Sequence, residues 1–250
     1  MMVTYIWRQE LVPVLAIDPV LHYYPLLACR QEPRAPVSVW KSEDGAILGA
    51  VVPCDPPGRA WLMAGCNQAA AELAREVPSD TGVSFPHWAE EIVAENAPSR
   101  SISTDVLAVC TQASLCQPHL RKGFRIQGLE RAPGAGTPAT VSTVVRVAHM
   151  GCVVEGTLAG FCTYHLDGHG CGSVDRLSIS EEWRGADIGK TLLSAAAAVM
   201  LQETERVIFA AAGDNIALLG AARASGFRTS YWLKYASPAE PGRESGRRPE

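Results

Sequence analysis

Residues 174–190 read VDRLSISEEWRGADIGK, and this stretch decides the fold of the chain. Its apolar start predicts a strand, and a polar turn around Gly185 leads into a helix. Amides at a helix start lack intrahelical partners and carry the positive end of the helix dipole. Small residues let a phosphate approach them, and Arg184 and Lys190 add positive charge. We therefore predict an anion-binding turn. An ordinary strand–helix connection is the alternative, since neither a P-loop nor a G-x-G-x-x-G fingerprint is present.

The segments on either side of this stretch predict alternating strands and helices. Three strands are expected between residues 152 and 179, with tight turns at Glu155-Gly156 and Asp167-Gly168. A helix, a fully buried strand, a second helix and a last strand are then expected at residues 190–205, 207–212, 216–225 and 231–235. Asp214 or Asn215 can cap the second helix, and Gly226 followed by Phe227 fits its end. The order joins antiparallel hairpins to a parallel βαβ step.

The N-terminal part repeats this order in weaker form. Residues 37–52 resemble residues 152–164, and both contain the pattern G-x-[IL]-x-G. Segments typical of strand, helix, strand, helix and strand follow in matching order up to residue 110. Similarity on that scale predicts a duplicated fold, with two unrelated hairpins as the alternative.

Composition limits the domain plan and the class of protein. The Gly- and Pro-rich residues 131–140 predict a linker between domains at 1–130 and 141–236, and residues 237–250 predict a solvated tail. Hydrophobic residues make up 47% of the 250 and charged residues 19%, which excludes a disordered chain. The net charge of -4 argues against a nucleic-acid partner.

The same counts predict where the chain works. No apolar run reaches the roughly 20 residues that span a bilayer, and charged residues interrupt the N-terminal apolar stretch. We therefore expect a cytoplasmic protein with no membrane partner. The eight cysteines include no C-x-x-C pair and are expected to be mostly buried thiols.

One cluster has the residue types of a zinc site. His165, His169 and Cys171 lie close together in sequence with Asp167. Because Asp167-Gly168 marks a hairpin tip, solvated side chains are the alternative, and we predict no metal.

Residues 174–193 resemble the acyl-CoA-binding segment of the GNAT superfamily of N-acetyltransferases, whose motif is [QR]-x-x-G-x-[GA] after a strand. Residues 214–227 are similar to the family's N-x-x-A-x-x-x-Y-x-x-x-G-F helix. The resemblance covers roughly residues 145–235, and two-GNAT-domain chains such as glycine N-acyltransferase-like proteins offer a precedent for the rest. It implies an α+β fold: a mixed, mostly antiparallel sheet flanked by helices, in tandem with a degenerate N-terminal copy.

The resemblance also implies a cosubstrate and a site. Acetyl-CoA or another acyl-CoA would donate an acyl group directly to a small-molecule or peptide amine in a ternary complex. The backbone of Leu177 and Ile179 would bind the pantetheine arm, Asn215 would touch it, and an amide near Ile179 would meet the oxyanion. Asp175 would act as general base. The residues expected to wrap the pyrophosphate are Arg184, Gly185, Ala186, Asp187, Ile188, Gly189 and Lys190.

Two residues depart from the family pattern. Asp187 stands where the motif has Gly, and Ala222 stands where the helix has the Tyr that often serves as general acid. Tyr231 or Ser225 could substitute for that Tyr. A non-catalytic acyl-CoA-binding module, or an acyltransferase that takes its acyl group from an acyl carrier protein, are therefore the alternatives. The low charge content is also compatible with a homodimer.

Overall fold

The computed structural model describes residues 2–54, 58–98, 100–118, 120–131, 133, 146–167 and 170–238. The chain forms two compact units. Unit 1 comprises Met1–Asp105 and Trp232–Glu250, and unit 2 comprises Val106–Tyr231. These limits differ from the expected domains at 1–130 and 141–236. The expected linker, and the expected tail beyond residue 238, lie almost entirely outside the described residues.

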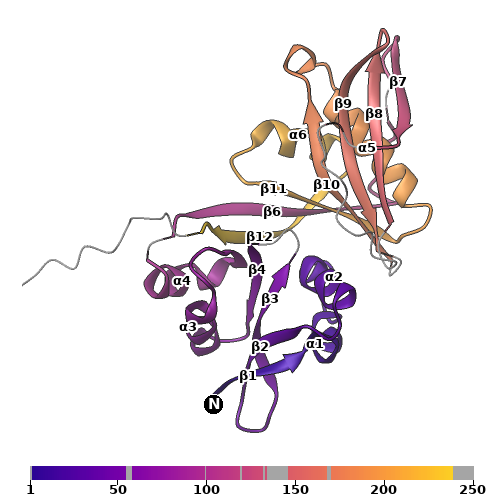
Figure 1. The fold of residues 1–250 in the computed structure, drawn as a ribbon. Coiled ribbons are helices and arrows are strands. Elements are labelled where there is room, and N and C mark those ends of the chain that lie inside the picture. The colour runs from indigo at the N-terminus through magenta and orange to yellow at the C-terminus, as the bar shows by residue number, and fades with distance from the viewer. Residues whose placement is uncertain are drawn as a thin grey trace, which may run out of the picture. The chain divides into compact units, whose positions relative to one another are not determined.

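Unit 1 is a twisted sheet with helices on both faces (Figure 1). The strands are β1 (Met2–Trp7), β2 (Pro36–Lys41), β3 (Ile47–Cys54), β4 (Arg59–Ala64), β5 (Gly82–Pro86) and the end of β12 (Arg228–Ala236), in that order. The helices are α1 (Arg8–Leu15), α2 (Tyr23–Gln31), α3 (Asn67–Glu76), the short η1 (His87–Ala89) and α4 (Glu90–Asn96). All pairings are antiparallel except β4–β5.

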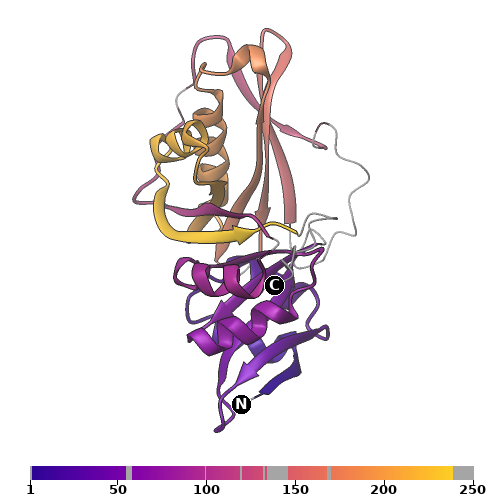
Figure 2. The same ribbon diagram turned by 90° about the vertical axis from the view of Figure 1, so that its left-hand side faces the viewer.

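Unit 2 repeats this plan. Its strand order is β7 (Phe124–Leu129), β8 (Arg146–Val154), β9 (Thr157–Leu166), β10 (Cys171–Ile179), β11 (Arg206–Ala212) and β6 (Ile102–Thr111). The three pairings from β7 to β10 are antiparallel, and β10–β11 is parallel. The helices α5 (Ile188–Met200) and α6 (Ile216–Ala224) lie on one side of these strands (Figure 2).

The two strand orders show a duplicated fold in which the last strands are exchanged. In unit 1 the sixth strand is β12, from the end of the chain, and in unit 2 it is β6, from the middle. This exchange is why the compact units do not follow the chain halves. It also explains why Ala236, the last residue of β12, is fully buried in the core of unit 1.

The turns and caps of unit 2 agree with the sequence. Asn215 caps α6, because its Oδ1 accepts a hydrogen bond from the Leu218 amide at 3.1 Å. Gly226 ends the helix with φ 98°, while the Phe227 amide donates to the Ala222 carbonyl at 3.0 Å. Glu155 and Gly156 both have positive φ at the β8–β9 turn.

Elsewhere the structure differs from what the sequence led us to expect. Asp167 is buried rather than solvated, and its carboxylate accepts a hydrogen bond from the Cys171 amide at 3.3 Å; Gly168 and His169 lie outside the described residues. Strands β1 and β7 and helices α1 and α2 were not foreseen. Helix α1 contains an internal proline, Pro13, while α2 has Pro25 in its first turn, and both helices have a weak apolar stripe.

All eight cysteines are free thiols, and five of them are buried, as expected. Burial raises the pKa of Cys29 to about 11 and that of Cys162 to about 12, so these thiols stay protonated and inert. Within the described part of the chain, no helix has the length and apolar character needed to cross a membrane.

Candidate functional site

Strands β10 and β11 separate part-way along their length. Their parallel pairing ends at Val174 and Phe209, although β10 continues to Ile179. The Ser180 amide donates to the Ala159 carbonyl of β9 at 3.0 Å, in a register that pairs Ile179 with Gly160. Because successive amides in an antiparallel strand point to opposite edges, the amides of Leu177 and Ile179 face the open edge. An extended ligand could pair with this edge as an added strand would.

The turn after β10 presents a group of unpartnered amides. A short η2 helix (Glu181–Trp183) is followed by Gly185 with φ 81° and Asp187 with φ 64°, and α5 then begins at Ile188. Among the described residues, five amides of this turn donate to no acceptor: those of Gly185, Asp187, Ile188, Gly189 and Lys190. Such a concave set of N–H groups at a helix start, here called the nest, binds anions, phosphate above all.

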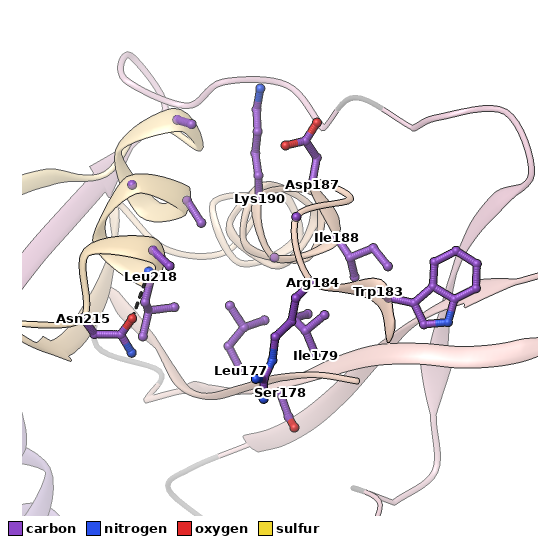
Figure 3. Close-up of a pocket in the computed structure, with 16 residues that line it drawn as sticks. Leu177, Ser178, Ile179, Trp183, Arg184, Asp187, Ile188, Lys190, Asn215 and Leu218 are labelled. Atoms are coloured by element: carbon purple, nitrogen blue, oxygen red, sulfur yellow. Dashed lines mark hydrogen bonds between the residues drawn. The ribbon is translucent and has the colours of Figure 1, made fainter. Parts of the chain in front are cut away.

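A groove of about 680 Å³ joins the open edge of β10 to this turn (Figure 3). It contains every cofactor residue expected from the sequence except Ala186. The Ala186 amide instead donates to the Trp183 carbonyl at 3.3 Å and closes the turn. The expected residues that line the groove are Leu177, Ile179, Arg184, Gly185, Asp187, Ile188, Gly189, Lys190 and Asn215.

The Asp187 carboxylate does not fill the groove. Arg121 holds it with an ion pair of 2.5 Å between Nη2 and Oδ2. In Figure 3 the side chains of Asp187 and Lys190 extend away from Leu177 and Ile179. The left-handed backbone explains why Asp is tolerated where the family motif has Gly, since Asp adopts this conformation more readily than most residues.

The charges at the mouth of the groove are mixed in sign. Arg184 is exposed and lies 3.4 Å from Glu181, and Figure 3 shows its side chain directed toward β10. Glu182 adds a further exposed carboxylate. Because Arg121, Arg184 and Lys190 stand among three acids, Glu181, Glu182 and Asp187, the mouth of the groove is not a basic patch.

Sequence reasoning missed the wall that α6 contributes. Ala217, Gly220, Ala221 and Ala224 line the groove at helical spacing, together with Leu218. Their small side chains leave room beside the helix, and a Cβ built on Gly220 would meet nothing within 4 Å. This stripe of small residues is the feature of the sequence that could have predicted the wall. Ser178 and Trp183 also line the groove unforeseen.

Asp175 lies outside the groove lining, at an irregularity in β10 where the register with β9 shifts. Its Oδ2 lies 2.7 Å from Nδ1 of His165 on β9, and its Oδ1 accepts a hydrogen bond from the Ser173 hydroxyl. The sequence drew attention to His165 only as a zinc candidate. Among the described residues, no cluster of three His, Cys, Asp or Glu side chains could hold a metal ion.

The geometry supports neither Ser225 nor Tyr231 as the general acid in place of the missing Tyr. Ser225 is fully buried, and its hydroxyl donates to the carbonyls of Lys190 and Ala221 at 3.0 and 2.8 Å. Tyr231 does not line the groove. Ala222 itself is buried in the core of unit 2.

Comparison with known proteins agrees with this geometry. The model of the acetyltransferase (GNAT) family matches residues 138–227. The C-terminal part of this chain is a GNAT domain. Proteins of this family generally transfer acyl groups from acyl-CoA, so an N-acetyltransferase is the class of activity that the match supports. A search of the curated proteins finds no match.

Solved structures match both units together. A tandem GNAT protein from the clavulanic acid biosynthesis pathway is 17% identical, with 96% of this chain and 100% of that chain covered and a TM-score of 0.60. A GCN5-related N-acetyltransferase from Sphaerobacter thermophilus is 13% identical, covers 96% of each chain and has a TM-score of 0.58. A GNAT-family acetyltransferase from Colwellia psychrerythraea is 13% identical over 95% and 100%, with a TM-score of 0.56. At these identities the likeness establishes the tandem GNAT fold.

Proposed function

We propose that the chain transfers an acetyl or other acyl group from acyl-CoA to a primary amine, by direct attack in a ternary complex. The observation that carries this proposal is the groove that joins five unpartnered amides to the open edge of β10. The pyrophosphate would accept hydrogen bonds from the turn between Gly185 and Lys190. The pantetheine arm would pair with the backbone of Leu177 and Ile179, with the Asn215 side chain beside it.

The chemistry then requires a neutral amine and a stabilised oxyanion. A group near Asp175 would take one proton from the acceptor ammonium, since protonated amines do not attack. The amine nitrogen then bonds to the thioester carbon, and a free amide of the open β10 edge would meet the oxyanion. The C–S bond breaks, and the thiolate takes the second proton of the amine. A thiol near pKa 8.5 leaves readily without a Tyr, so Ala222 does not exclude the reaction.

The two alternatives draw less support from the site. The argument for a non-catalytic module was that the Asp187 carboxylate would repel the pyrophosphate. The Arg121–Asp187 ion pair weakens this argument, because the carboxylate is neutralised outside the nest. A carrier-protein donor would require a basic surface at the mouth of the groove. Glu181 and Glu182 oppose that reading, so free acyl-CoA is the favoured donor.

Isothermal titration with acetyl-CoA tests the donor. We expect one site per chain, because the connection between β4 and α3 in unit 1 is only Gly65 and Cys66, too short to form a comparable nest. Gly185→Val should weaken binding at least tenfold, since it places a β-branched residue at positive φ within the nest. Gly45→Val is the matched control: Gly45 also has positive φ and open surroundings but lies in unit 1.

Thiol release from several acyl-CoAs against a panel of amines tests the transfer. Turnover with a primary amine supports the proposal. Binding of acetyl-CoA without turnover for any amine would favour the non-catalytic module. The absence of heat at millimolar acetyl-CoA would exclude the donor assignment.

A further inference from the structure

A polar cluster lies on the face of the unit 2 sheet opposite α5. Helix α5 covers the face of Gly172, because a Cβ at Gly172 would come within 2.7 Å of the Met200 sulfur. Tyr164 faces the same core. Side chains alternate along a strand, so His165 and Ser173, which are register partners, lie on the opposite face.

The hydrogen bonds of this cluster fix the tautomer of one histidine. The Asp175 carboxylate is acceptor-only when ionised, so the 2.7 Å contact from His165 Nδ1 requires a proton on Nδ1. The neutral imidazole then carries its free lone pair on Nε2, which has no partner among the described residues. Both side chains are about a quarter exposed, at 26% and 28%. Ser173 occupies the other carboxylate oxygen and holds Asp175 in place.

The pair lies just beyond the groove, because Asp175 is two residues before Leu177, the first residue of β10 that lines it. Asp175 follows directly on Val174, where β10 and β11 stop pairing, and precedes the open-edge residues Leu177 and Ile179. At about 3.3 Å per residue, Asp175 lies roughly 13 Å along β10 from Ile179. A chain-like donor anchored at the α5 turn and running along this edge would bring its acyl end to the His165–Asp175 pair.

We propose that His165, rather than Asp175, is the catalytic base, and that Asp175 is its positioning residue. The inference rests on the proposed function. The Nε2 lone pair takes one proton from the acceptor ammonium and gives an imidazolium paired with the Asp175 carboxylate. The free amine attacks the thioester carbon, the C–S bond breaks, and the thiolate receives the second amine proton. The imidazolium then releases its proton to water, which completes the balance.

Other charged groups near His165 come from both neighbouring strands. His149 on β8 donates to or accepts from the Thr163 hydroxyl at 3.1 Å, and burial and the charge of His165 lower its pKa. Arg176 on β10 has its guanidinium over the Phe161 ring at 5.1 Å, and no ion pair joins it to Asp175 in the part of the chain that the structure describes. Only Asp175 is therefore in ion-pair contact with the imidazole among the described residues.

The test is the pH dependence of kcat/KM for amine acetylation by the full chain. Wild type should show a rising limb set by an imidazole. His165→Gln should lose that limb and fall on the order of 100-fold, while the Kd for acetyl-CoA stays within threefold. Asp175→Asn should lower the rate, and Asp175→Glu should recover part of it. His87→Gln, at an exposed histidine of unit 1, is the matched control.

Each other outcome has a definite meaning. An unchanged limb in His165→Gln with its loss in Asp175→Asn would make Asp175 the base and overturn the inference. Loss of the limb in His149→Gln alone would overturn it in favour of the second histidine. Nitrogen NMR of His165 gives a readout independent of turnover: a proton on Nδ1 that depends on Asp175 supports the pair, and a proton on Nε2 refutes it. Wild-type inactivity with every amine would instead refute the proposed function.

Discussion

Asp187 shows how one residue can depart from a family motif without destroying the site. The backbone there is left-handed, with φ 64°, and the carboxylate is paired with Arg121 at 2.5 Å. The position thus imposes two separate requirements. The backbone must accept positive φ, and the side chain must keep its charge away from an incoming pyrophosphate.

Substitutions of Asp187 separate these requirements. Asp187→Gly should change the Kd for acetyl-CoA by less than about threefold, because the loop keeps its shape and the carboxylate was already neutralised. Asp187→Val should weaken binding about tenfold. The left-handed conformation costs a β-branched residue about 1–2 kcal/mol, which corresponds to roughly a 5- to 30-fold change in an equilibrium constant. Titration calorimetry measures both. A large gain in affinity for Asp187→Gly would show instead that the natural loop is compromised.

Arg121 gives a second residue-scale prediction. Arg121→Ala should weaken acetyl-CoA binding several-fold, because it leaves the Asp187 carboxylate unpaired beside the bound anion. The double variant Arg121→Ala with Asp187→Gly should restore most of the affinity. Additive losses in the same calorimetric experiment would mean that Arg121 contacts the ligand itself.

His22 predicts a pH dependence of stability. Burial lowers its pKa from 6.5, partly opposed by the contact of Nδ1 with the Leu15 carbonyl at 3.1 Å and by Asp18. The folded chain therefore binds fewer protons than the unfolded chain just below pH 6.5. The stability from neutral His22 is complete above that pH and is lost as the pH falls through the lowered pKa. Urea unfolding at pH 7.5 and pH 5 should show a smaller loss for His22→Gln; an equal loss would contradict the assignment.

At the scale of elements, the connection that ends α6 is as constrained as the nest. Gly226 has φ 98°, and a Cβ there would lie 2.1 Å from the Ser114 carbonyl oxygen and 2.8 Å from the Cys116 nitrogen. The Cys116 amide also donates to the Ser225 carbonyl at 3.2 Å. This close approach fixes the end of the helix that walls the groove.

Gly226→Ala should therefore destabilise the protein by about 3 kcal/mol, the sum of backbone strain and overlap with a neighbouring backbone. Chemical denaturation measures the change. Gly128→Ala is the matched control, because Gly128 is exposed in β7 with nothing within 4 Å of its Cβ, and it should change stability by less than about 0.5 kcal/mol. Equal effects from the two variants would show that the contact with Ser114 is dispensable.

At the scale of the whole molecule, the exchange of strands places the C-terminal strand in unit 1 and a strand from the middle of the chain in unit 2. Residues Leu233–Ala236 pair with β5, and Lys234 Nζ lies 2.8 Å from a Glu90 carboxylate oxygen. Unit 1 therefore depends on residues that follow the GNAT domain in sequence.

A chain that ends at Tyr231 should lose the cooperative unfolding of unit 1. The amides of β5 should exchange with solvent at least 100-fold faster, because the strand loses its antiparallel partner and the core loses Leu233 and Ala236. Hydrogen exchange of the β5 peptides measures this. A chain that ends at Pro238 keeps β12 and is the control. Unchanged protection in the shorter chain would show that β12 does not hold unit 1 together.

Local chemistry in the sequence determined much of this protein. The apolar periods, the Asn215 cap, Gly226 with Phe227, and the motif from Arg184 to Gly189 specified most of unit 2 and the side of its groove that β10 and the α5 turn form, since each depends on residues close in the chain. The repeated pattern at Gly45 and Gly156 indicated the duplication for the same reason.

Tertiary structure alone decided the rest, because it depends on residues far apart in sequence. The pairing of Arg121 with Asp187 spans 66 positions, and that of His165 with Asp175 depends on the register of two strands. The sequence also did not predict that β6 and β12 lie in each other's units. Nearby residues determine whether a segment forms a strand, whereas distant residues determine which strand it pairs with. The sequence predicted a functional carboxylate at Asp175, but only the fold showed that the imidazole of His165 lies beside it.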